Sequence, residues 1–306
     1  MLIAVGSVKG APGVTTVTTA LAALWPEAQH TRRLVAELDP SGGDLAVRYG
    51  LPATPGLASF AAATRRTREP AAVWDHTHLV VGGSHVLPAP PAAAQAHAAL
   101  TILASGPGRS LLRGAAANPG VVLLADCGRL GPATPAEAIA RQADVLLLVS
   151  GTRPDELAHT AARLGELAAW TPRPCLLLTG TGHSTRDVER ALGIPTIGRL
   201  PHDPTGAAAL TRITPPAQRR RGLARRIAAL ARALTAPSAT PRPTPDGGLP
   251  AAVPGVPPQQ VRTAGPSLPG PPSPSAPASP PSPPSAGEQV RRDVQHSTSA
   301  GQEPLS

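Results

Sequence analysis

The sequence predicts an α/β domain with a doubly wound, mostly parallel sheet over residues 1–235. Short apolar runs, suited to strands buried on both faces, alternate there with longer helix-like segments. The first apolar run leads into a glycine-containing turn, and a later run ends in an aspartate. In open parallel sheets the ligand lies at the carboxyl ends of the strands, so both features are expected at one edge.

Residues 2–16, LIAVGSVKGAPGVTT, read as a strand, a tight loop and the start of a helix. Gly10 and Gly13 allow the loop backbone to approach a ligand closely. Amides at the start of the helix attract a phosphate, and Thr15 stands where its hydroxyl can hold a magnesium ion. This order predicts a phosphate-binding loop, with an ordinary strand–turn–helix as the alternative.

The loop departs from the usual G-x-x-x-x-G-K-[ST] pattern because Val14 occupies the lysine position. It resembles a degenerate form of the deviant K-G-G-x-G-K-T-T loop of the ParA/MinD family of P-loop ATPases, as in MinD-like or CpaE-like members of actinobacterial type. The resemblance implies that Lys9, the only lysine of the chain, takes part in catalysis across a dimer interface. It also implies that ATP is bound by Lys9, Gly10, Ala11, Gly13, Val14, Thr15 and Thr16.

A second predicted strand, residues 34–38, ends at Asp39, which is followed by Pro40. This segment resembles the D-x-D-P segment of the same family, with Glu37 in place of the first aspartate. The resemblance gives Asp39 the catalytic role of positioning the attacking water, which suits phosphoryl transfer because that chemistry depends on an oriented water and a metal. The alternative is a strand-ending Asp-Pro turn.

Residues 121–126, VVLLAD, are an apolar strand ending in Asp126, which is the Walker B pattern. We expect Asp126 and Thr15 to hold Mg²⁺ at the carboxyl edge of the sheet. Residues 127–131 resemble the family's D-x-x-x-G switch segment.

Further strands are expected at residues 143–150, 174–179 and 194–200. The asparagine that contacts adenine in many relatives is replaced by Thr179-Gly180, so no adenine-binding residue is predicted.

The connecting segments predict helices within residues 44–70, at 92–104 and at 109–117, and a third strand at 76–83. Cys127 and Cys175 lie in or beside apolar runs, fit no metal spacing, and are expected to be small buried residues of a protein in a reducing compartment.

Residues 217–234 predict a basic amphipathic helix with an apolar stripe of Leu223, Ile227, Leu230 and Leu234. Three interpretations remain open: packing on the sheet with solvated arginines, non-specific DNA binding as in ParA-like proteins, or membrane attachment as in MinD-like proteins. The candidate polyanion-binding residues are Arg219, Arg220, Arg221, Arg225 and Arg226.

Residues 236–306 contain mainly Pro, Ser, Ala and Gly and too few large apolar residues to form a core, so they predict a disordered tail after a single domain over 1–235. The net charge of +9 permits contact with nucleic acid or an anionic membrane. No signal peptide or transmembrane run is seen, which favours a cytoplasmic location, at most peripheral to nucleoid or membrane.

The resemblance implies an Mg-ATP-dependent homodimer that positions or partitions a cargo such as DNA or a division, secretion or pilus machine. A partner, ParB-like or a secretion ATPase, would dock through the tail or another surface. Val14, Ala11 and Pro12 weaken the loop, because they remove a cation, a flexible residue and an amide donor. The alternatives are therefore a pseudo-ATPase scaffold with little or no hydrolysis and a DNA-binding accessory protein.

Overall fold

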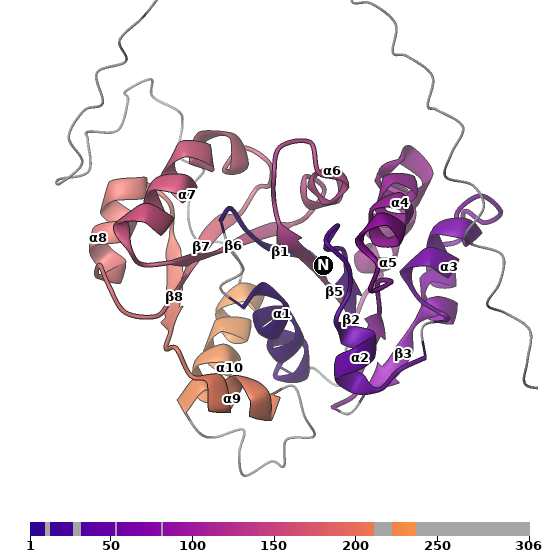
Figure 1. The fold of residues 1–306 in the computed structure, drawn as a ribbon, viewed down its shortest axis with the longest axis horizontal. Helices are drawn as coiled ribbons and strands as arrows, with labels where there is room; N and C mark the ends of the chain where they lie inside the picture. The colour runs from indigo at the N-terminus through magenta and orange to yellow at the C-terminus, as the bar shows by residue number, and fades with distance from the viewer. Residues whose placement is uncertain (10–12, 27–31, 53, 81, 211–221, 237–306) are drawn as a thin grey trace, which may run out of the picture. The chain divides into compact units, whose positions relative to one another are not determined.

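An eight-stranded sheet lies at the centre of the part of the chain that the structure describes (Figure 1). The structure is a computed structural model that describes residues 1–9, 13–26, 32–52, 54–80, 82–210 and 222–236. The strand order is β3-β4-β2-β5-β1-β6-β7-β8, and every neighbouring pair is parallel except β3 and β4. This arrangement confirms the predicted fold class. The strands are β1 (Leu2–Ser7), β2 (Arg32–Glu37), β3 (His78–Val80), β4 (Ser84–Leu87), β5 (Val121–Arg129), β6 (Val145–Gly151), β7 (Pro174–Thr179) and β8 (Thr196–Leu200).

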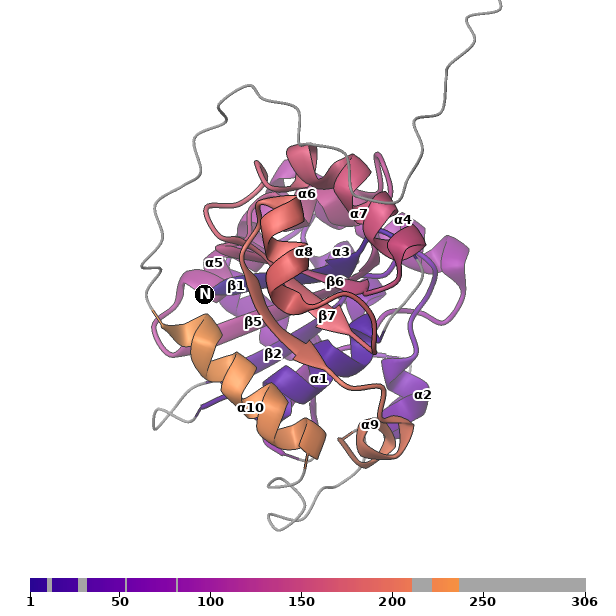
Figure 2. The same cartoon turned by 90° about the vertical axis from the view of Figure 1, so that its left-hand side faces the viewer.

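Helices cover both faces of this sheet (Figures 1 and 2). One face carries α1 (Val14–Ala23), α2 (Leu45–Tyr49), α9 (Pro204–Leu210) and α10 (Gly222–Thr235). The other face carries α3 (Leu57–Ala63), α4 (Ala93–Ala104), α5 (Gly106–Ala117), α6 (Pro135–Ala140), α7 (Pro154–Leu167) and α8 (Thr185–Leu192), together with the 3-10 helix η1 (Pro70–His76). No described helix combines the length and the apolar character needed to cross a membrane.

The central strands are apolar on both sides because each side is covered. In β5, Val122 and Leu124 belong to the apolar cluster on the α1 face, whereas Leu123 and Ala125 belong to the cluster on the opposite face. This explains the uninterrupted apolar runs of the sequence. It also leaves the carboxyl ends of β1, β2, β5 and β6 at the same edge.

The predicted third strand, residues 76–83, is wrong in its extent. Residues Pro70–His76 form η1, and only His78–Val80 form β3, which pairs antiparallel with β4. Between these two strands, Gly82 and Gly83 have φ angles of 97° and 76°, a conformation that favours glycine. The glycines therefore mark a hairpin turn rather than the end of a strand.

Helix α10 is the described part of the predicted basic helix. Its stripe residues Leu223, Ile227, Leu230 and Leu234 are all buried, and the helix contacts α1, α9 and β8. The guanidinium of Arg173 donates to the carbonyls of Ala233, Leu234 and Ala236, which satisfies the C-terminal end of the helix. The stripe thus packs inside the fold. Residues 217–221 lie outside the described residues, as does all of the predicted tail except Ala236.

Candidate functional site

Helix α1 starts at the carboxyl end of β1, a central strand that has other strands of the sheet on both sides. Strand β1 lies between β5 and β6, and the chain leaves its carboxyl end toward α1. Gly13 caps α1 with a φ of 89°, a left-handed conformation that strains any other residue. Thr15 and Thr16 follow in the first turn. Gly10 and Ala11, two of the predicted nucleotide-binding residues, lie outside the described residues.

Val14 is part of the core. Its side chain is 2% exposed and belongs to the apolar cluster that α1 forms with its face of the sheet. A residue at this position of an ordinary phosphate-binding loop is a lysine that contacts phosphates. Here the position contributes packing instead.

Asp126 is the fully buried carboxylate of the site. It is 0% exposed, and its Oδ1 accepts the Gly128 N–H at 3.2 Å, whereas Oδ2 has no hydrogen-bond partner among the described residues. Burial raises the pKa of Asp126 to about 7, the negative charge of Glu37 adds to this shift, and the neighbouring Thr15 hydroxyl opposes it. The Gly128 N–H and the Thr15 hydroxyl favour the charged form, but they do not offset the effect of burial.

This donor set suits a magnesium ion. A carboxylate oxygen without a partner and a hydroxyl at the start of α1 are the oxygen ligands that Mg²⁺ prefers. A cation at this position would also offset the burial that raises the pKa of Asp126. Thr15 and Asp126 are the residues that would hold it.

Glu37 anchors the backbone beside the site. Its Oε1 accepts the N–H groups of Asp44 and Leu45 at 2.7 and 3.0 Å, and its Oε2 accepts the Ala89 N–H at 2.9 Å. Gly43 is needed for this contact, because a Cβ there would lie 2.4 Å from Oε2. Burial raises the pKa of Glu37, and these three hydrogen bonds oppose the shift. The sequence shows that Glu37 stands where the family has an aspartate, but it does not reveal that this side chain anchors the backbone.

Asp39 lies beside Gly128, at the end of β5. Its Oδ1 accepts the Ser41 N–H at 2.8 Å, and a Cβ on Gly128 would lie 2.0 Å from its Oδ2. Gly128 also has a φ of 54°. Both predicted residues therefore lie against Gly128: Asp126 accepts its N–H, and the Asp39 carboxylate occupies the space that a Cβ would need. Asp39 also forms the Asp-Pro turn of the alternative interpretation.

Lys9 is exposed, and its Nζ lies 2.9 Å from Nε2 of His159 in α7. The predicted role of Lys9 places it at a second subunit, whereas its contact here is within the chain. His159 carried no signal in the sequence.

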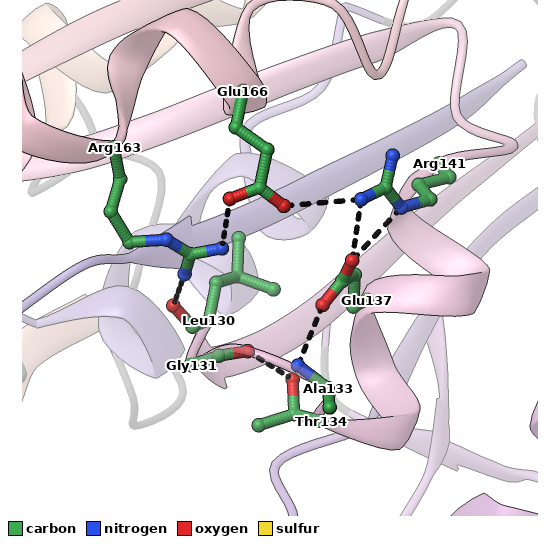
Figure 3. A network of polar contacts seen from close by, with 8 residues as sticks. All are labelled: Leu130, Gly131, Ala133, Thr134, Glu137, Arg141, Arg163 and Glu166. Carbon is green, nitrogen blue, oxygen red and sulfur yellow. Dashed lines mark hydrogen bonds and ion pairs between the residues drawn. The ribbon is translucent and has the colours of Figure 1, made fainter.

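The segment after β5 is held by a network of charged side chains (Figure 3). Arg163 of α7 donates to the Leu130 carbonyl, and Glu137 of α6 accepts the Ala133 N–H at 3.0 Å. Glu166 joins these helices through ion pairs with Arg141 at 3.1 Å and with Arg163 at 3.0 Å. The predicted switch segment is thus connected to α6 and α7.

The basic face of α10 is only partly described. Arg225 and Arg226 are exposed, and Arg226 donates to the Arg199 carbonyl at 3.4 Å. Arg219, Arg220 and Arg221 lie outside the described residues.

No protein-family model and no curated protein matches the sequence. Solved structures do match it. A ParA family ATPase from Chlorobium tepidum TLS is 17% identical, with a TM-score of 0.62 over 75% of this chain and 98% of that one. The septum site-determining protein MinD from Pyrococcus horikoshii OT3, complexed with Mg-ADP, is 18% identical, with a TM-score of 0.59 over 76% and 95%. A variant of Cyanothece McdA in complex with ATP is 16% identical, with a TM-score of 0.57 over 78% and 98%. The chain therefore has the fold of the ParA, MinD and McdA ATPases.

Proposed function

We propose that this chain is a MinD/ParA-like nucleotide switch that binds Mg-ATP at the carboxyl edge of its sheet and dimerises when it does so. One observation carries the proposal: the buried Asp126 has an unpartnered oxygen next to Thr15, at the start of the helix that follows the phosphate-binding loop. Solved structures of this fold bind nucleotides, as the Mg-ADP complex of MinD and the ATP complex of McdA illustrate.

Each site residue has one role in this proposal. Thr15 and Asp126 hold Mg²⁺, which neutralises phosphate charge when bound. The helix amides after Gly13 face the phosphates. Asp39 orients the attacking water, and Lys9 leaves His159 to reach the nucleotide of the second subunit.

A pseudo-ATPase scaffold is the second candidate function, favoured by the burial of Val14. Without a lysine at this position, less positive charge is available where charge develops during phosphoryl transfer. Such a protein would bind ATP and dimerise but hydrolyse ATP slowly or not at all. Its output, like that of the active switch, would be the positioning of a cargo.

The exposed arginines of α10 are the candidate surface for a polyanion. Because the apolar stripe of α10 packs on α1, α9 and β8, insertion of this helix into a membrane would require it to leave the fold. The exposed face presents Arg225, Arg226 and Arg232, so we favour DNA over lipid as the partner of this face. A protein partner for the proline-rich tail remains part of the proposal.

Titration of the purified full chain with Mg-ATP and Mg-ADP, followed by calorimetry and sedimentation, tests the switch. We expect ATP, and not ADP, to produce a dimer, Thr15→Ala to weaken Mg-ATP binding, and Lys9→Ala to abolish the dimer while ATP still binds. Arg190→Ala, which removes another exposed positive charge, is the control and should behave like the wild type. Absence of binding at millimolar ATP would refute the proposal.

A turnover assay then separates the two candidates. Hydrolysis that Asp39→Ala abolishes would identify an ATPase. Binding and dimerisation without turnover would identify the scaffold.

A further inference from the structure

The ladder between β1 and β5 shifts by one residue at the site. Val5 pairs with Asp126, and an uninterrupted parallel ladder would therefore place Gly128 opposite Ser7. The observed partner of Ser7 is Arg129. Gly128, with its φ of 54°, supplies the unusual conformation within this bulge. The bulge thus brings an arginine level with the last residue of β1.

Arg129 is held at the start of the phosphate-binding loop. Its Nε donates to the Val8 carbonyl at 3.3 Å, and Val8 directly precedes Lys9. The next residue, Leu130, is anchored on both sides, because its N–H donates to the Ser7 carbonyl at 2.8 Å and its carbonyl accepts from Arg163 (Figure 3). The backbone that carries Arg129 is therefore positioned by hydrogen bonds to β1 and to α7.

The terminal nitrogens of Arg129 have capacity for a ligand. The residue is exposed, and its bond to Val8 uses Nε alone; Nη1 and Nη2 make no hydrogen bond or ion pair with a described residue. A guanidinium in this state can bind phosphate oxygens with two parallel N–H groups.

A phosphate-binding loop usually supplies such a cation from its own lysine. The usual lysine position is Val14, which is buried in the core, and Lys9 contacts His159. We infer that Arg129 binds the nucleotide phosphates and supplies the positive charge that Val14 cannot. This inference rests on the proposed function, since it assigns a phosphate-binding residue to the same site.

Calorimetric titration of the full chain with Mg-ATP tests the inference on four proteins: wild type, Arg129→Ala, Arg129→Lys and Arg190→Ala. We expect Arg129→Ala to weaken ATP binding by about tenfold or more, because the variant cannot form the charge-assisted hydrogen bonds to phosphate. Arg129→Lys should bind with intermediate affinity, since it keeps the charge but not the paired donors. Arg190→Ala should match the wild type.

A melting temperature measured without nucleotide separates ligand binding from folding. The inference requires that Arg129→Ala melts within about 2 °C of the wild type, as expected for removal of one exposed hydrogen bond.

Three results would overturn the inference. Equal ATP affinity in Arg129→Ala and the wild type would remove Arg129 from the site while leaving the proposed function intact. Weaker binding together with a clearly lower melting temperature in Arg129→Ala would make the residue structural. Absence of ATP binding by the wild type would refute both the inference and the proposed function.

Discussion

Glu37 and Asp126 are direct partners across β2 and β5, yet their carboxyl groups have opposite surroundings. Glu37 accepts three backbone N–H groups, whereas Asp126 accepts one and has an oxygen without a partner among the described residues. The Glu37 carboxylate therefore holds the backbone of the fold, whereas Oδ2 of Asp126 is available to a ligand.

Asp126→Asn should stabilise the metal-free protein at neutral and alkaline pH. Burial raises the pKa of Asp126 in the folded state from its ordinary value of 3.8 to about 7. The folded state therefore binds the extra proton between these values, and the free energy of unfolding of the wild type falls as the pH rises from about 4 to about 7. The variant lacks this fall, so with chelator at pH 8 it should gain up to about 4 kcal/mol. Denaturant unfolding at pH 5 and pH 8 measures it, and a gain equal at both pH values would contradict the explanation.

Glu37→Gln should destabilise the protein, in contrast to Asp126→Asn. The amide group of glutamine would turn a donor toward at least one backbone N–H, so the variant should lose about 2 kcal/mol of stability at pH 5. The loss should be smaller at pH 8, because burial raises the pKa of Glu37 and ionisation of this carboxyl already lowers the stability of the wild type there. Unchanged stability would mean that the loop from Asp44 to Leu45 does not depend on these bonds.

Gly128→Ala should destabilise the protein and disturb the site. The new Cβ would lie 2.0 Å from Oδ2 of Asp39, and the φ of 54° disfavours alanine, so we expect a loss of about 2 kcal/mol. Gly131→Ala is the matched control, because its Cβ would lie 3.4 Å from the nearest side-chain atom. Thermal unfolding compares the two, and equal losses would refute the close approach of Asp39.

Combining Asp39→Ala with Gly128→Ala isolates that approach. Removing the carboxylate should relieve the two closest contacts but leave the Cβ of residue 39 at 2.8 Å and the backbone strain, so the double variant should recover part of the loss. Simple addition of the two effects would show that the residues do not interact.

The sequence was sufficient for the order of the site elements. Thr15, Asp39 and Asp126 follow apolar runs or a glycine turn, and parallel strands with carboxyl ends at one edge must bring such residues together. Local pattern could not reveal the packing of Val14, because a valine in a loop motif looks the same whether it lines the loop or the core. The bulge at Gly128 was equally hidden, since the partner strand decides register.

Arg163→Met should loosen the segment that follows β5 while leaving the sheet unchanged. The variant loses the bond to the Leu130 carbonyl, the ion pair with Glu166 and the cation–π contact of the guanidinium with Trp170. We expect faster amide exchange at Leu130, Gly131 and Ala133 and a stability loss of about 1 kcal/mol. Hydrogen–deuterium exchange resolves this. Arg190→Met breaks an exposed ion pair with Asp187 and should leave the segment unchanged; equal exchange in both variants would show that Arg163 does not hold it.

The two faces of α10 should respond differently to substitution. Ile227 is 1% exposed, so Ile227→Ala should lower the free energy of unfolding by about 2–4 kcal/mol.

Arg225 and Arg232 are exposed, and replacing both with glutamine should change stability by less than about 1 kcal/mol. If this face holds DNA, the double glutamine variant should bind duplex DNA more weakly and with a shallower salt dependence, by about 0.9 in log–log slope for each phosphate that it no longer neutralises. Fluorescence anisotropy at several salt concentrations measures the slope. An unchanged slope would remove these two arginines from the DNA surface, and an unchanged melting temperature in Ile227→Ala would mean that α10 does not depend on its packing.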